Sequence, residues 1–78
     1  MNRSELAEIL KREGFRYDAY ALDGGCLDER YCLDNSYGVW SVYYSERGLQ
    51  SGKKEFAIES DACEYFLQML RKDSSTRT

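Results

Sequence analysis

Histidine is absent from the 78 residues of this chain. Without it the chain has no Ser-His-Asp or Cys-His nucleophile system and lacks the commonest metal ligand. No run of about 20 apolar residues is present to span a bilayer. The residues after Met1 begin an amphipathic segment rather than a secretory signal. The sequence therefore predicts a cytoplasmic protein that neither crosses a membrane nor uses histidine-dependent catalysis.

Cysteine is scarce, with three residues and no Cys-x-x-Cys pair. An odd number of cysteines without a signal peptide is a poor disulfide framework. We expect Cys32 and Cys63 to be small buried hydrophobic residues and Cys26 to lie in a turn. The carboxylates fall mostly in predicted turns and helix starts, and neither a phosphate-binding loop nor a calcium loop is present. The sequence predicts no enzyme activity, no metal and no cofactor.

Amphipathic segments at both ends of the chain predict two helices. Asn2, with an acidic residue three positions later, predicts the start of the first helix, and Gly14 predicts its end. Ser60 is the expected cap of the second helix, which has acidic residues in its first turn and basic residues in its last. Residues 1–73 form the predicted single domain, and residues 74–78 a flexible polar tail.

The middle of the chain predicts four strands, at residues 17–22, 30–34, 39–46 and 54–58. An Asp-Gly-Gly turn predicts a hairpin between the first two strands, and residues 47–52 are expected to form a flexible connection. The predicted fold class is α+β in two layers: a four-stranded antiparallel sheet with the N-terminal and C-terminal helices packed on one face. Tyrosines are expected on the other face, in contact with solvent.

The net charge of −3 is unevenly distributed. Residues 18–34 contain five acids and one base, whereas the rest of the chain is almost balanced. An acidic balance argues against direct binding of nucleic acid. A local acidic patch orients association with a basic protein, although turns also favour aspartate for conformational reasons. Tyrosine, which occurs seven times, is enriched both in binding patches and in strands.

The acidic stretch and the tyrosines select the candidate residues for contact with a protein partner. The acidic contacts, the tyrosine anchors and the charged rim are, in chain order, Asp23, Asp28, Glu29, Arg30, Asp34, Tyr37, Tyr43 and Glu46.

Three runs of residues resemble small bacterial immunity proteins of polymorphic toxins, including contact-dependent growth-inhibition systems. They are Glu29–Leu33 (ERYCL), Trp40–Gly48 (WSVYYSERG) and Phe56–Phe66 (FAIESDACEYF). The resemblance implies a cytosolic antidote that binds one cognate toxin and blocks its active site or its approach to substrate. Many such toxins act on nucleic acid or nucleotides and have basic active-site surfaces. The resemblance supplies no catalytic motif, so no site residue is transferred from it.

A second interpretation is a small structural or regulatory protein-interaction module. One form of it is a homodimer in which two copies pair through an exposed tyrosine face. Under the antidote interpretation the free chain is expected to be a monomer or a weak dimer.

Overall fold

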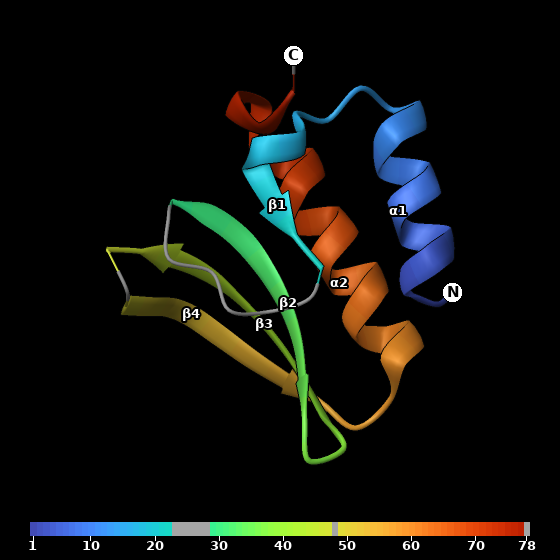
Figure 1. Ribbon diagram of the computed structural model, residues 1–78, viewed down its shortest axis with the longest axis vertical. Coiled ribbons are helices and arrows are strands. Elements are labelled where there is room, and N and C mark those ends of the chain that lie inside the picture. The colour runs from blue at the N-terminus through green and yellow to red at the C-terminus, as the bar shows by residue number, and fades with distance from the viewer. Residues whose placement is uncertain (23–28, 48, 78) are drawn as a thin grey trace.

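Two helices and a four-stranded sheet form the α+β fold of the computed structural model (Figure 1), which describes residues 1–22, 29–47 and 49–77. The helices are α1 (Arg3–Arg12) and α2 (Glu59–Lys72), with short 3-10 helices η1 (Tyr17–Ala19) and η2 (Ser74–Thr76). The strands are β1 (Tyr20–Ala21), β2 (Arg30–Ser36), β3 (Val39–Glu46) and β4 (Leu49–Phe56). None of the helices in these ranges is long and apolar enough to cross a membrane.

The sheet has the order β1-β2-β3-β4 and is mixed rather than wholly antiparallel. Strands β2, β3 and β4 form the predicted antiparallel meander, but β1 is parallel to β2, with Tyr20 opposite Tyr31. The predicted hairpin between the first two strands is therefore wrong, because parallel strands need a crossover connection rather than a tight turn. The expected flexible connection at residues 47–52 is also wrong in part, since β4 begins at Leu49.

The core lies between the helices and one face of the sheet. Leu6 and Leu10 of α1 are buried together with Phe66 of α2 and with Leu33 and Val42 of the sheet. Side chains three and four residues apart share one side of a helix, and alternate residues share one side of a strand. The helical stripes and the alternation in β3 therefore point to one apolar layer, which confirms the predicted placement of both helices.

The ends of α1 follow their sequence signals closely. The side chain of Asn2 accepts a hydrogen bond from the Glu5 amide at 2.9 Å, and the Glu5 carboxylate accepts one from the Asn2 amide at 3.2 Å. At the other end Gly14 has φ 79°, and the Phe15 amide donates to the Leu10 carbonyl at 3.1 Å. This is the expected Schellman stop, in which a left-handed glycine lets the chain turn back on the helix.

The other helix begins differently from the prediction, because its N-cap is Ile58 and has no side-chain hydrogen bond. Ser60 lies within the first turn of α2, and its hydroxyl oxygen accepts a hydrogen bond from the N-terminal amine of Met1 at 3.1 Å. Ser60 therefore helps to attach the chain start to α2 rather than capping that helix.

The C-terminal residues are packed rather than frayed, contrary to the predicted flexible tail. Thr76 is buried, and its hydroxyl donates to the Leu70 carbonyl at 2.8 Å. The Arg16 amide donates to the Thr76 carbonyl at 2.7 Å, and Phe15 forms an isolated bridge with Arg77. These contacts join η2 to the segment that follows α1, so the domain extends to the end of the described residues.

Candidate interaction surface

The predicted contact residues do not form one patch. Glu29, Arg30 and Glu46 lie near one another where β2 begins and β3 ends, since Arg30 is opposite Ser45 in the sheet. Burial raises the pKa of Tyr44, and the charges of Glu29 and Glu46 raise it further, which places both carboxylates near that ring. Tyr37 lies beyond the other end of β2.

Asp34 and Tyr43 lie between these two ends, on the face of the sheet that points away from the helices. Tyr43 is opposite Cys32, and these two residues alternate with Leu33 and Val42, which enter the core. Burial raises the pKa of Tyr43 and the charge of Asp34 raises it further, so the two side chains are neighbours. Asp23 and Asp28 fall outside the described residues.

Tyr43 is only 3% exposed, so the expectation that it anchors a partner from an exposed face is wrong. Cys32, Ser41 and Ser45 on the same face are also buried. The alternation of residues along β3 correctly assigns side chains to the two faces of the strand. It does not reveal that side chains on both faces are buried. The predicted solvent-exposed tyrosine face is therefore not found in this part of the sheet.

The two described cysteines differ from each other. Cys63 is a free, buried thiol, as predicted, and burial raises its pKa to about 11. Cys32 is buried too, but it is disulfide-bonded, which contradicts the prediction of a simple thiol. Its bonding partner is not among the described residues, and the predicted turn position of Cys26 also falls outside them. The described residues contain no group of three or more side chains suited to hold a metal ion.

Tyr37 occupies the tip of the hairpin between β2 and β3 and is fully exposed. Both residues of this two-residue loop are left-handed, with φ 54° at Tyr37 and 78° at Gly38. Such turns suit the twist of a hairpin, but they favour asparagine, aspartate or glycine at the first position. A left-handed conformation costs most other residues about 1–2 kcal/mol. Because no packing within the described chain offsets this strain, Tyr37 is a candidate functional residue.

Apolar side chains accompany Tyr37 at this end of the molecule. Val39 is 38% exposed and Ile58 is 58% exposed. Trp40 is opposite Phe56, so the start of β3 and the segment after β4 lie side by side, as Figure 1 shows at the lower end. We call Tyr37, Val39 and Ile58 the hairpin-end surface.

Sequence reasoning identified only Tyr37 of these three residues. Ile58 was expected inside the fourth strand, on the same side as Phe56. In the structure that strand ends at Phe56, and Ile58 caps α2 with its side chain exposed. The sequence offers a weak signal for this, because Ser60 and Asp61 lie close after Ile58 and favour the start of a helix.

A small polar pocket lies at the opposite end of the molecule. It has a volume of about 40 Å³ and lies beside Tyr31, Tyr44 and Asp73. The Tyr31 hydroxyl donates to Asp73 at 3.0 Å, and burial, followed by this hydrogen bond, raises the pKa of Tyr31 to about 12. A tyrosine with this pKa stays protonated at neutral pH and is a poor general base. The hydrogen bond beside the pocket therefore joins β2 to the end of α2. The pocket itself is too small for a substrate.

Searches of protein-family models, of curated proteins and of solved structures find no match to this chain.

Proposed function

We propose that this chain is a protein-binding antidote that neutralises one cognate toxin with a basic active-site surface. In this proposal the hairpin-end surface is the centre of the contact, and the acidic residues of 18–34 guide the approach. The observation that carries the proposal is Tyr37, a fully exposed aromatic residue in a strained conformation. The choice of a toxin as the partner rests on the resemblance of the sequence to immunity proteins.

Tyr37 has the properties of an interface anchor. Tyrosine is enriched among residues that dominate binding energy, because it offers a large contact area with few rotatable bonds. Its place on a tight two-residue turn restricts the backbone and so fixes the direction of the Cα–Cβ bond. Val39 and Ile58 supply apolar area nearby that can exclude water around such an anchor.

The size of the chain is compatible with this use of its surface. A standard interface buries about 800 Å² on each partner. The total accessible surface is 5002 Å², so such a contact needs about a sixth of it.

The acidic stretch contributes to the rate and orientation of association. Negative side chains attract a basic partner over distances of about 10 Å at moderate salt concentration. Glu29 lies at the other end of β2 from Tyr37, about 20 Å away by the rise of a strand, whereas Asp34 lies two residues before the hairpin end of β2. We therefore expect Asp34→Asn to slow association with the toxin and to weaken its dependence on salt. Because the two side chains have almost the same shape, this change should leave the fold intact.

The homodimer interpretation receives no comparable support from the described residues. The exposed tyrosine face that it required is absent there, because Tyr43 is buried. Strand β4 has a free edge, but Lys53, Lys54 and an irregularity between Val42 and Tyr44 in its pairing with β3 discourage strand pairing between molecules.

Growth rescue tests the proposal. Cells that produce the toxin domain encoded beside the gene for this chain should survive when the chain is also produced. Tyr37→Asn should weaken binding by at least about 30-fold, as expected for an interface hot spot, and should reduce rescue. Arg47→Asn is the matched control, because Arg47 is the other described non-glycine residue with positive φ and lies at the opposite end of β3.

Two results would contradict the proposal. If the unaltered chain neither binds the purified toxin domain nor restores growth, it is not that toxin's antidote. If binding occurs but Tyr37→Asn and Arg47→Asn both retain full affinity, the hairpin-end surface is not the contact.

A further inference from the structure

The C-terminal ends of α1 and α2 lie at the same end of the molecule, opposite the hairpin-end surface (Figure 1). The fold brings basic residues from both termini of the chain to this end: Lys11, Arg12, Arg16, Arg71, Lys72 and Arg77. Some of this charge has an ordinary structural role, since bases complement the negative ends of helix dipoles. Glu13 pairs with Arg71 and Arg77, which accounts for two of the six.

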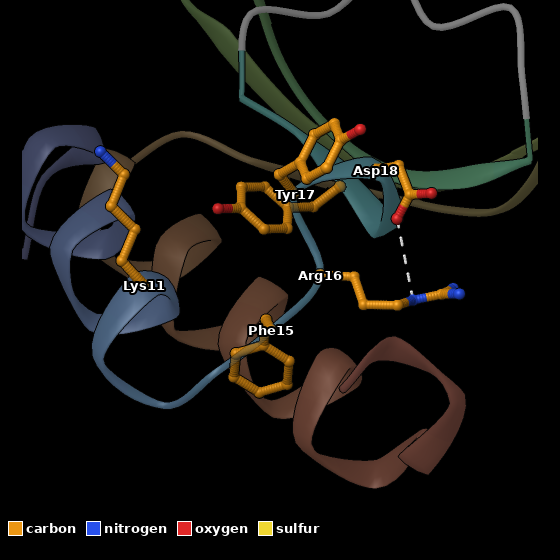
Figure 2. Close-up of a pocket in the computed structure, with 6 residues that line it drawn as sticks. Lys11, Phe15, Arg16, Tyr17 and Asp18 are labelled. Atoms are coloured by element: carbon orange, nitrogen blue, oxygen red, sulfur yellow. Dashed lines mark ion pairs between the residues drawn. The ribbon is translucent and has the colours of Figure 1, made fainter. Parts of the chain in front are cut away.

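An open groove lies beside Lys11 and Arg16, two of the four basic residues that do not pair with Glu13. It has a volume of about 470 Å³ and is lined by Lys11, Phe15, Arg16, Tyr17, Asp18 and Tyr20. Figure 2 shows the groove between the end of α1, which carries Lys11, and the turn that carries Tyr17. Sites for small molecules have volumes of about 300–1,000 Å³ and combine apolar walls with a few polar groups.

Local structure holds the walls of the groove in place. The stop at Gly14 turns the chain so that Phe15 is buried, with the Arg77 guanidinium 4.5 Å from the centre of its ring. The next turn, η1, leaves Tyr17 87% exposed. An aromatic face beside a fixed apolar residue is suited to stacking against a flat ring.

The charged groups of the groove favour an anion. Among the described residues, the Lys11 ammonium has no hydrogen-bond or ion-pair partner. Arg16 pairs with Asp18 through its Nε atom at 3.7 Å, and its guanidinium points away from Lys11 and from the ring of Tyr17 (Figure 2). Because this pair is neutral, the Lys11 ammonium is the positive charge that the groove offers to a ligand.

We infer that this groove binds a small aromatic anion, namely a flat ring that carries one phosphate or carboxylate group. The ring stacks on Tyr17, and the Lys11 ammonium holds the anionic group. A small ligand fits better than a long nucleic acid, because the acidic remainder of the chain repels a polyanion. The site is separate from the hairpin-end surface and does not depend on the antidote proposal.

Adenosine monophosphate is a suitable probe, because it combines a flat ring with a phosphate. Titration of the ¹⁵N-labelled chain should shift the amide signals of residues 11–20. Adenosine, which lacks the charge, and ribose 5-phosphate, which lacks the ring, should each bind at least tenfold more weakly. Tyr17→Ala should weaken binding of the nucleotide at least fivefold, as loss of one stacking contact predicts. Lys11→Gln should weaken it and reduce its dependence on salt.

Matched variants separate this site from general effects. Tyr37→Ala removes an equally exposed tyrosine elsewhere, and Lys53→Gln removes a distant lysine, so both should bind as the unaltered chain does. Circular dichroism would verify that each variant is folded. The inference is wrong if no saturable shifts occur at about 10 mM nucleotide. It is also wrong if ribose 5-phosphate binds as well as the nucleotide, if Tyr17→Ala has no effect, or if the groove prefers an oligonucleotide or an acidic peptide.

Discussion

The hydroxyl of Tyr31 donates a hydrogen bond to the Oδ2 atom of Asp73 at 3.0 Å, across 42 positions of the chain. Tyr31 belongs to β2, whereas Asp73 ends α2. The other carboxylate oxygen of Asp73 accepts from the Ser75 amide at 3.0 Å and from the Ser75 hydroxyl at 2.6 Å. One carboxylate therefore connects the sheet, the end of α2 and the first turn of η2.

Removing the Tyr31 hydroxyl tests this connection. Tyr31→Phe should lower the free energy of unfolding by about 1–2 kcal/mol, because it breaks a partly buried hydrogen bond to a charged group. Urea denaturation followed by circular dichroism measures the change. Tyr17→Phe is the control, since the Tyr17 hydroxyl is exposed and has no partner among the described residues. Equal stability of the two variants would show that the connection contributes nothing.

Acid should weaken the fold through Glu13 and Asp73. The hydrogen bond from Arg71 lowers the pKa of Glu13, and hydrogen bonds from Ser75 and then Tyr31 lower the pKa of Asp73. A carboxylate whose pKa is lower in the folded state stabilises the fold fully above its unfolded pKa, about 4. That stability is lost as the pH falls through the folded-state pKa.

The variants Glu13→Gln and Glu8→Gln make this prediction specific. Unfolding free energies measured between about pH 7 and pH 2 should fall less steeply at the acidic end for Glu13→Gln than for the unaltered chain. Glu8→Gln should keep the original slope, because Glu8 is exposed on α1 and has no ion-pair partner among the described residues. An unchanged slope for Glu13→Gln would contradict the prediction.

Cys63 should be chemically inert in the folded protein. Its side chain is buried, and burial, followed by the charge of Glu59, raises the pKa of the thiol to about 11. Because the thiolate is the reactive form, iodoacetamide at about pH 8 should not modify Cys63 until the protein is unfolded in urea. Peptide mapping by mass spectrometry gives the extent of modification under both conditions. Rapid modification of Cys63 under native conditions would contradict the buried position.

The sequence predicted those parts of the fold that depend on local signals. Asn2 and Gly14 act on backbone groups within a few residues, so both ends of α1 could be located in advance. The direction of β1 depends instead on its pairing with β2, and a turn signal between the two strands does not report that pairing. The packed end of the chain was missed for a similar reason, because the partners of Thr76 include Arg16, which lies far away in sequence.

The candidate site was predictable only at the hairpin tip. A turn residue such as Tyr37 has few neighbours, so its exposure follows from its position. The burial of Tyr43 depends on what covers that face of the sheet, which alternation along one strand cannot show. Tyr17 was not selected, because its exposure depends on η1, a single turn that the sequence pattern had assigned to a strand.

The strain at Tyr37 can be measured through the stability of the fold. Tyr37→Asn should raise the free energy of unfolding by about 1 kcal/mol, because asparagine tolerates the left-handed conformation and the Tyr37 ring is fully exposed. Arg47→Asn should give a similar gain, since Arg47 has φ 52° and is also exposed. Urea denaturation of both variants provides the comparison.

The two substitutions together separate a stabilising role of Tyr37 from a binding role. If Tyr37→Asn gains stability and loses binding while Arg47→Asn keeps binding, Tyr37 lowers the stability of the fold but is needed for binding. Arg47→Asn, which relieves the same strain at the opposite end of β3, should gain stability and keep binding. If Tyr37→Asn is instead less stable than the unaltered chain, the ring contributes to the fold, and its strained position needs no partner to explain it.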